Sequence, residues 1–334
     1  MQSALVGTMY FSFYTRASKR SAMLFPNQQW MEREQRFIAS LPLSQVALPG
    51  SHDAGTWDID CCSPWSPERV EWWAPLARAF PWVTMRYAIT QNYPVEEQAM
   101  RGIRYFDMRV CAYVAAAGRE YRFVHGMLGG DFVEGVRRLC QFARENPKEI
   151  LILDVRFTEN FTADDHVFMQ RTFAALAGER LATVQHFDPN TPVRDFWEAG
   201  RNLVVLYPNA DPRYGLWPAN YITTKWPHTT VVPACLVLLD ASLRLRNVSK
   251  PQLHCLQACL TPDTAWVLRN PLKTTQQLAR LLNAQLVKRL PKWRGKLNCI
   301  MVDVIEFPGM VDAVIALNRP VLDDEDDDDD NAAE

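Results

Sequence analysis

Apolar segments of strand length alternate with amphipathic helical segments along most of the chain, and this alternation limits the possible folds more than any other feature. Buried parallel strands are almost continuous apolar runs, and the strand-like segments are 44–50, 103–110, 121–126, 149–157, 202–208, 253–260 and 298–307. Helical periodicity of apolar residues is found in 131–146, 274–290 and 309–318. Successive strand–helix units of this kind predict an α/β fold, a TIM-type (β/α) barrel with some irregularity.

An open, doubly wound α/β sheet is the structural alternative, but no GxGxxG motif follows the first strand-like segment. The length of 334 residues is compatible with one large barrel that carries extensions. We therefore assign the barrel to residues 39–320, with an N-terminal extension, 1–38, before it and an acidic tail, 321–334, after it.

The tail is strongly acidic, whereas the rest of the chain is basic. The tail holds nine acidic groups, so the overall formal charge of −2 corresponds to +7 for the remaining residues. Like charges repel one another and resist burial, so we expect the tail to be disordered. A basic body suits an anionic membrane surface, and the tail would compete with lipid for it. No nucleic-acid partner is predicted.

The cysteines and the N-terminal segment give indications about the cellular compartment of the protein. None of the eight cysteines forms a paired CxxC framework, which favours a reducing compartment such as the cytoplasm. No apolar run is long enough to span a bilayer, so any membrane association is expected to be peripheral. The N-terminal segment contains the basic residues Arg16, Lys19 and Arg20 and has no acidic residue before Glu32. A mitochondrial presequence is therefore an alternative for this segment.

A tryptophan-rich insertion, 57–95, interrupts the strand–helix rhythm after the first strand-like segment. It contains five of the eleven tryptophans: Trp57, Trp65, Trp72, Trp73 and Trp82. One interpretation is an insertion that packs on the mouth of the barrel. The other is an interfacial patch, because tryptophan side chains prefer the headgroup depth of a membrane.

Polar residues occur repeatedly where the strand-like segments end. They are His52, Asp53, Asp107, Arg109, His125, Asp154, Arg156 and Asp303. In a parallel barrel the carboxyl ends of the strands form one face, and catalytic groups project from that face. A single such residue is more often structural than catalytic, but the repetition along the chain favours a common site.

The residue types in this set suit the cleavage of a phosphodiester. Two histidines can serve as base and acid in one step, and neighbouring carboxylates can orient their rings. The guanidinium of Arg109 offers a planar fork for two phosphate oxygens. The spacing resembles neither a zinc-binding HExxH motif nor a P-loop.

Five segments resemble the X domain of the phosphatidylinositol-specific phospholipase C family in its stand-alone form. They are LPGSHDAGTW, RGIRYFDMRV, FVHGM, NPKEILILDVRF and NCIMVDVIEF, and the similarity spans residues 41–318. The resemblance implies that the 2-hydroxyl of inositol attacks phosphorus, which releases diacylglycerol and leaves an inositol 1,2-cyclic phosphate. The substrate would be phosphatidylinositol or a related phospholipid at a membrane surface.

The same resemblance implies roles for individual residues. His52 would be the general base, oriented by Asp303, and His125 the general acid, supported by Asp53. Arg109 would bind the phosphate, with Asp107 beside it.

Calcium-dependent family members place a carboxylate where this chain has Arg109, and Arg156 stands near another ligand position. Two guanidinium groups would repel Ca²⁺ and can replace a cation electrostatically. We therefore expect a metal-independent site without a cofactor.

The substrate-binding residues are less clearly marked. Bacterial family members bind inositol with an Arg and an Asp–Tyr arrangement on later strands, and this chain has no obvious match there. Candidates for the pocket are Arg156, Lys225 and Trp226, with His228 close by, although a plain structural loop explains TTKWPHTT equally well.

Two rival functions remain open. A glycerophosphodiester phosphodiesterase is also a barrel enzyme, but that family uses a His-Arg pair and a Glu-x-Asp metal pair, whereas this chain has His-Asp and Asp-x-Arg. The second rival is a phosphoinositide-binding module that has lost catalysis, against which the presence of both histidines argues.

Overall fold

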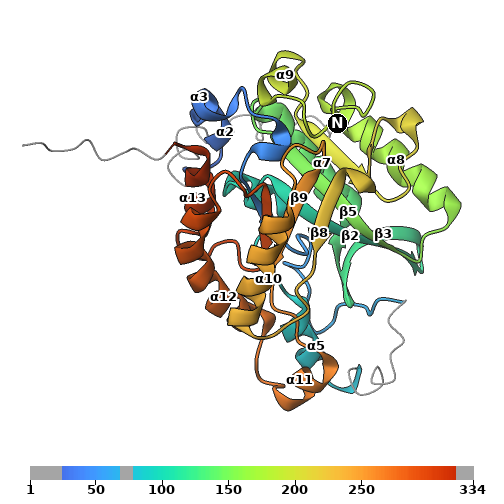
Figure 1. The fold of residues 1–334 in the computed structure, drawn as a ribbon. Coiled ribbons are helices and arrows are strands. Elements are labelled where there is room, and N and C mark those ends of the chain that lie inside the picture. Colours follow the sequence, from blue (N-terminus) through green and yellow to red (C-terminus); the bar gives the residue numbers. More distant parts are fainter. Residues whose placement is uncertain (1–24, 68–77, 321–334) are drawn as a thin grey trace, which may run out of the picture.

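The protein folds around one curled sheet of parallel strands that forms an irregular barrel (Figure 1). The computed structural model describes residues 25–67 and 78–320. The strands, in the order in which they lie side by side, are β7 (Trp217–Pro218), β6 (Leu203–Tyr207), β5 (Leu151–Glu159), β2 (Tyr105–Ala115), β1 (Leu48–Ser51), β10 (Cys299–Val302), β9 (Leu253–Ala258) and β8 (Ile222–Lys225). All seven pairings along this path are parallel, so the carboxyl ends of the strands share one face. The predicted α/β barrel is confirmed.

The barrel has a seam between β7 and β8. These two strands follow each other in the chain and are separated only by the 3-10 turn η4 (Ala219–Tyr221). β7 pairs with β6, and β8 pairs with β9. Within the described ranges no ladder joins β7 to β8. The edges of the sheet are therefore connected by a short stretch of covalent chain and not by interstrand hydrogen bonds.

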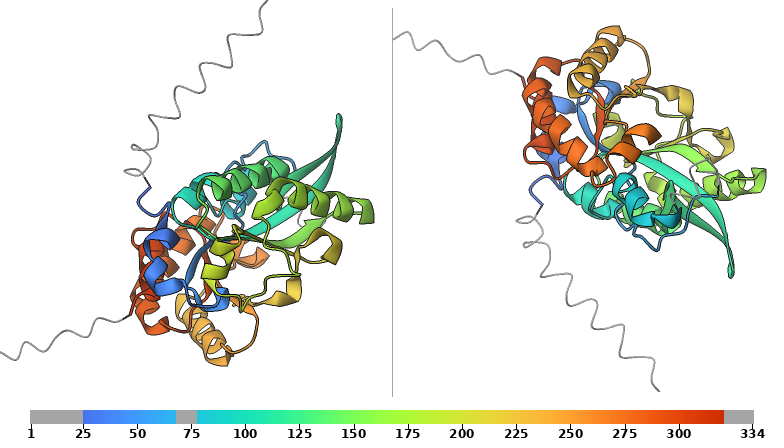
Figure 2. Two further views of the ribbon diagram at one scale, coloured as in Figure 1. Left: turned by 90° about the horizontal axis from the view of Figure 1, so that it is seen from above. Right: turned by 90° about the horizontal axis from the view of Figure 1, so that it is seen from below.

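Helices cover the outside of the barrel (Figures 1 and 2). They are α6 (Val95–Met100), α7 (Phe132–Glu145), α8 (Ala163–Ala177), α9 (Val193–Glu198), α10 (Val232–Leu245), α12 (Thr275–Arg289) and α13 (Met310–Ile315). The sequence marks several of their starts. Asp131 caps α7 by accepting from the Glu134 amide at 2.7 Å, and Thr274 forms a capping box with Gln277 at the start of α12.

Two further helices, α5 (Pro81–Ala88) and α11 (Thr264–Arg269), lie beside each other beyond the carboxyl ends of the strands (Figure 1). The Tyr87 hydroxyl on α5 donates to the carbonyl of Asn270, just after α11, at 2.6 Å. The rings of Tyr87 and Trp266 also meet edge to face, with centroids 6.1 Å apart. Contacts between distant parts of the sequence thus place both helices over the face where catalytic groups are expected.

The segment 121–126 is a strand, but not a strand of the barrel, and this corrects its expected place. It belongs to β3 (Gly118–His125), which returns antiparallel along β2 and continues into β4 (Met127–Asp131). Figure 2 shows the β2–β3 hairpin projecting away from the barrel. Because β3 runs back toward the barrel, its last residue, His125, still reaches the carboxyl face.

The other predicted strands and helices are present with shifted ends. The segment 44–50 begins with the 3-10 turn η1 (Leu43–Gln45), so β1 occupies only Leu48–Ser51. The segment 298–307 ends as a strand at Val302, where the chain turns sharply through Val304. These ends differ because the register of neighbouring strands, which apolar character does not reveal, decides where pairing stops.

The opposite, amino-terminal end of the barrel is closed by α2 (Trp30–Arg33) and α3 (Gln35–Ile38). Trp30 is fully buried and donates from Nε1 to the carbonyl of Gly102 at 3.0 Å. Beside it the buried Arg104 pairs with Glu149, which also accepts from the Met31 amide at 3.2 Å. Residues 30–38 thus pack against the barrel core, while the proposed domain boundaries at 38 and 320 stay predictions.

Three features of the sequence lie outside the described residues: the basic N-terminal segment, Trp72 and Trp73, and the acidic tail. Among the residues that are described, no helix is both long enough and apolar enough to cross a bilayer.

Candidate active site

The site begins where β1 and β10 end side by side. Ser51 pairs with Val302 in the parallel ladder, so the next residues, His52 and Asp303, emerge together. Nδ1 of His52 lies 2.6 Å from Oδ1 of Asp303, and both side chains are buried. The strand register therefore produces the His–carboxylate pair without help from a flexible loop.

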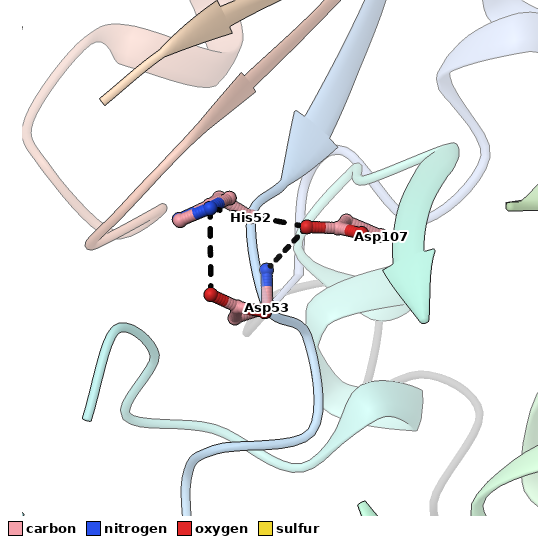
Figure 3. Close-up of side chains that lie close together, drawn as sticks. All are labelled: His52, Asp53 and Asp107. Carbon is pink, nitrogen blue, oxygen red and sulfur yellow. Dashed lines mark hydrogen bonds and ion pairs between the residues drawn. The ribbon is translucent and has the colours of Figure 1, made fainter. Parts of the chain in front are cut away.

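Asp53 and Arg109 add an ion-paired layer next to this histidine. Nε of Arg109 contacts Oδ1 of Asp53, and a terminal nitrogen of Arg109 lies 3.0 Å from Oδ2 of Asp107. The same Asp107 oxygen accepts from the backbone amide of Asp53 at 3.1 Å (Figure 3). The predicted i, i+2 pair on β2 thus holds the loop that follows β1.

His125 approaches Asp53 from the hairpin. Its Nε2 lies 3.2 Å from Oδ2 of Asp53, and its Nδ1 lies 2.8 Å from the carbonyl oxygen of Ala88. The ring centroids of His52 and His125 are 6.3 Å apart. Asp53 therefore stands between the two histidines, because Nε2 of His52 is 3.4 Å from the same carboxylate oxygen.

The neighbours of each ring nitrogen indicate where the protons reside. The Asp303 carboxylate can only accept, so Nδ1 of His52 carries a proton, and Nε2 faces the donor Arg109 at 3.1 Å. When His52 is neutral, its proton is therefore on Nδ1, and the lone pair of Nε2 faces Arg109. Both nitrogens of His125 face oxygen acceptors, an arrangement that favours the doubly protonated ring.

Opposing electrostatic effects act on the pKa of His52. Burial opposes charge on the ring, whereas Cys259 and the carboxylates of Asp53 and Asp303 favour it, and together they raise the pKa of His52 well above its usual range. Burial also raises the pKa of the Cys259 thiol, which is therefore neutral near pH 7. The two carboxylates consequently carry the effect on His52.

Arg109 stands where a metal ion would bind. His52, Asp53 and Asp107 each offer a ligand atom, and these atoms lie within 4.8 Å of one another (Figure 3). The guanidinium of Arg109, however, contacts all three residues and stacks on the Phe157 ring at 4.8 Å. A cation could enter this cluster only if Arg109 moved out, so the donor set suits a resident guanidinium better than a metal.

Arg156 pairs with Asp154 and Asp107 and is not among the residues that line the cavity above the site. Its Nε is 3.0 Å from Oδ2 of Asp154 and 3.7 Å from Oδ1 of Asp107, and it also donates to the Tyr105 hydroxyl at 3.2 Å. Burial alone would raise the pKa of Asp107, but Arg109 and Arg156 lower it to about 2. Arg156 thus keeps Asp107 ionised, a positioning role that differs from the predicted substrate contact.

A cavity of about 610 Å³ opens above these groups. His52, Arg109, His125 and Asp303 form its floor. Its walls come from α5, α11 and neighbouring loops, and the residues with apolar side chains among them include Trp65, Phe80, Trp82, Val83, Tyr87, Trp226, Leu260, Val267, Leu268 and Pro271. The described ends of the tryptophan-rich insertion therefore lie at the barrel mouth.

Of the pocket residues predicted at the end of β8, the structure places Trp226 in the cavity wall and Lys225 outside it. Trp226 lines the cavity and donates from Nε1 to the Thr261 hydroxyl at 2.6 Å. The ring of His228 packs against that of Trp226 at a tilt of 33°, with ring centroids 4.1 Å apart. Lys225 is exposed at the end of β8 and is not part of the cavity lining.

Two buried residues that sequence reasoning missed, Thr90 and Gln91, hold the turns that follow β1 and β10. Gln91 Nε2 donates to the carbonyls of His52 at 2.8 Å and of Val302 at 2.9 Å. The hydroxyl of Thr90 contacts the carbonyl of His52 at 3.1 Å, and its own carbonyl accepts from the Val304 amide at 2.9 Å. We call Thr90–Gln91 the clamp. No local pattern in the sequence reveals it, because its partners are more than thirty positions away.

The clamp holds two backbone conformations that are unfavourable for residues with a Cβ. Asp53 has φ 44° and Val304 has φ 56°. Left-handed backbone is rare for a β-branched residue and is found mainly where surrounding contacts impose it. Asp53 follows His52 and Val304 follows Asp303, so each positive φ lies next to a proposed catalytic residue. The contacts that hold these two turns therefore also fix the position of His52 relative to Asp303.

Comparison with known proteins identifies the family. No protein-family model matches the chain. It is 30% identical over 247 residues to human PI-PLC X domain-containing protein 2, which covers 73% of this chain and 80% of that protein. The chain belongs to the family of PI-PLC X domain-containing proteins. The zebrafish family member PI-PLC X domain-containing protein 3 is 26% identical over 309 residues, with 89% of this chain and 94% of that protein covered.

Solved structures of bacterial phosphatidylinositol-specific phospholipases C share the fold. The enzyme from Listeria monocytogenes superposes with a TM-score of 0.62 at 16% identity, covering 88% of this chain and 99% of that one. A variant of the Staphylococcus aureus enzyme gives a TM-score of 0.62 at 14% identity, over 88% and 99% of the two chains. This family member therefore has a phosphoinositide phosphodiesterase-like fold, as the sequence resemblance implied.

Proposed function

We propose that this X-domain protein is a phosphodiesterase of the phosphatidylinositol-specific phospholipase C type. The observation that carries the proposal is the pair of histidines on either side of Asp53, one placed to accept a proton and the other to donate one. A base and an acid with a guanidinium beside the base suit a displacement at phosphorus.

The proposed reaction uses the chain's own residues at each step. Nε2 of His52 removes the proton from the 2-hydroxyl of inositol as that oxygen forms its bond to phosphorus. Nε2 of His125 gives its proton to the glycerol oxygen as the second phosphorus–oxygen bond breaks. Diacylglycerol leaves with that proton, and inositol 1,2-cyclic phosphate remains. Arg109 neutralises the charge that develops on the phosphoryl oxygens.

The proposal includes independence from metal ions, because Arg109 fills the cluster in which a cation would bind. It also includes action at the surface of a membrane in contact with the cytoplasm, since the substrate is a membrane lipid and the body of the chain is basic.

A turnover assay with phosphatidylinositol vesicles, with and without EDTA, tests the function. We expect release of diacylglycerol and inositol cyclic phosphate at the same rate in both conditions. Loss of activity in EDTA that is restored by Ca²⁺ would overturn the interpretation of Arg109 as a substitute for a cation, whereas activity that survives EDTA disfavours a glycerophosphodiester phosphodiesterase. Vesicle binding without any turnover would identify a lipid-binding module that has lost catalysis.

A further inference from the structure

The excess positive charge of the body is concentrated in two short stretches of the chain, 244–250 and 288–296. Together they contain eight basic side chains and no acidic one: Arg244, Arg246, Lys250, Lys288, Arg289, Lys292, Arg294 and Lys296. We call these eight residues the basic patch. With the neighbouring carboxylate of Asp240, which pairs with Arg289, the patch has a net charge of +7. This value equals the whole net charge of the chain without its acidic tail.

The two stretches meet at the amino-terminal end of the barrel. One joins the end of α10 to β9, the other joins the end of α12 to β10, and the two helices lie side by side (Figure 1). Arg246 donates to the carbonyl of Lys296, and Nε1 of Trp293 donates to Asp240 on α10 at 2.8 Å. Among the described residues that line the cavity, none belongs to the patch. The patch and the two histidines therefore lie at opposite ends of the barrel.

The fold itself neutralises little of this charge. Within residues 25–67 and 78–320, the only member of the patch that pairs with a carboxylate is Arg289. Arg246 and Arg294 donate to backbone carbonyls, and the four lysines of the patch are exposed. Basic side chains do compensate the dipoles of α10 and α12 at their carboxyl ends, but each helix end carries only about half a charge. Two helix ends thus account for about one of the seven charges.

The chain leaves its described part beside this patch. After the 3-10 turn η6 (Ala316–Asn318) come Arg319 and Pro320. Arg294 of the patch donates to the carbonyl of Ala316 at 2.9 Å and also to that of Arg319. The acidic run 323–330 therefore begins a few residues from Arg294. An extended chain spans about 3.3 Å per residue and packed helix axes are about 8–10 Å apart, so this run is long enough to cross both helix ends.

We propose that the acidic tail, 321–334, binds to the basic patch of its own chain. Nine acidic groups would then lie against a net charge of +7, which relieves the repulsion among neighbouring carboxylates. Exposed ion pairs are individually weak, but the covalent tether keeps the tail near the patch at an effective concentration on the order of millimolar. The bound tail screens the patch from other polyanions and leaves the cavity at the opposite end open. The inference does not depend on the proposed function.

Zero-length cross-linking of the full chain tests the contact directly, because a carbodiimide joins a carboxylate to an amine only where the two meet. In the monomeric product, mass spectrometry should find tail carboxylates joined to Lys288, Lys292 or Lys296. Lys225 and Lys273, which are exposed outside the patch, should give at least about tenfold less product. The patch cross-links should disappear between ~0.01 M and ~1 M salt, as the Debye length falls from about 30 Å to about 3 Å.

Two cross-linking results would overturn the proposal. The first is an even distribution of tail cross-links over patch and control lysines, because an unbound tail reaches all exposed amines. The second is cross-links to the patch that occur only in dimers, because the occupant would then be the tail of a second copy.

A double-mutant cycle tests the screening with vesicles of phosphatidylcholine and phosphatidylserine at low salt. The tail is neutralised in the full chain by Asp326→Asn, Asp327→Asn, Asp328→Asn, Asp329→Asn and Asp330→Asn. This change should tighten vesicle binding by about fivefold or more, the equivalent of about 1 kcal/mol for one basic group brought to an anionic surface.

The same neutralised tail is then combined with two pairs of lysine substitutions. Lys292→Gln with Lys296→Gln should remove most of the gain, because the uncovered surface has lost charge. Lys225→Gln with Lys273→Gln is the matched control outside the patch and should keep the gain. Thermal unfolding of each variant detects any loss of folding. An equal gain with both pairs would mean that the tail repels vesicles without covering the patch, and would overturn the proposal.

Discussion

The two histidines differ in the atoms that face their rings, and this difference predicts separate losses of function. His52→Ala removes the proposed base and His125→Ala the proposed acid, so each should reduce kcat by about 10²–10⁴-fold. His186→Ala serves as the control, because His186 is exposed and distant in sequence from the site. Phosphatidylinositol turnover and thermal unfolding would be measured for all three. Near-normal rates in both site variants would contradict the assignment.

The Asp303 carboxylate is expected to set the pH dependence. A base acts only when neutral, and the pKa of His52 is raised, so kcat/KM should decline with falling pH from a midpoint above 6.5. In Asp303→Asn one of the two carboxylates that raise this pKa is lost, and the midpoint should move to lower pH while kcat decreases. A pH–rate profile that keeps the wild-type midpoint would show that Asp303 does not act on His52.

At the scale of residues, the sequence predicted which side chains meet but not all of their surroundings. His52, Asp53 and Asp303 lie together because β1 and β10 end side by side. Arg109 reaches them from β2 and His125 from the β2–β3 hairpin. The position of Arg156 differs from the prediction because its charge is used by Asp154 and Asp107 inside the barrel. Pairing of this kind depends on strand register and leaves no local pattern.

The clamp acts at the scale of elements, since it joins the loops after β1 and β10. Gln91→Met keeps the side-chain volume but removes the amide that donates to His52 and Val302. The carbonyls lose their partners and the strained turns can relax, so kcat should decrease by about 10-fold to 10²-fold with KM little changed. The pH midpoint should also move toward 6.5 as the His52–Asp303 pair loosens.

Gln98→Met is the matched control for the clamp. Gln98 is also fully buried, and its Nε2 donates to two carbonyls, those of Ala54 at 2.8 Å and Tyr93 at 2.7 Å. Both variants should lose about 1–3 kcal/mol of folding free energy. An equal loss of kcat in the two variants would mean that Gln91 acts only through stability.

Elements were predictable where local signals exist. The helices expected over 131–146 and 274–290 are present as α7 and α12, and their starts lie next to the local caps Asp131 and Thr274. The antiparallel direction of β3 was not predicted, because an apolar run has the same character in either direction. The hairpin nevertheless delivers His125 to the carboxyl face, so His125 lies near His52 for a different structural reason, and its catalytic role stays a prediction.

At the scale of the whole molecule, the seam is expected to be the least protected part of the sheet. β7 and β8 each pair on one side, whereas β10 pairs with both β1 and β9. Amide hydrogen exchange should therefore be faster at Ile222–Lys225 than at Cys299–Val302. Mass spectrometry of peptic fragments would measure both segments in one sample. Equal protection of the two would show that the seam opens only when the whole barrel unfolds.

The seam also has a consequence for the history of such barrels. Between most neighbouring strands, added residues must fit around a covering helix or disturb a ladder. Between Pro218 and Ile222 the structure has neither, because η4 alone joins the strands and both Ala219 and Asn220 are exposed. An insertion here breaks no interstrand hydrogen bond. Lineages that carry this barrel can therefore acquire new loops, and with them new surfaces, at this junction while the cluster of His52, His125 and Arg109 stays unchanged.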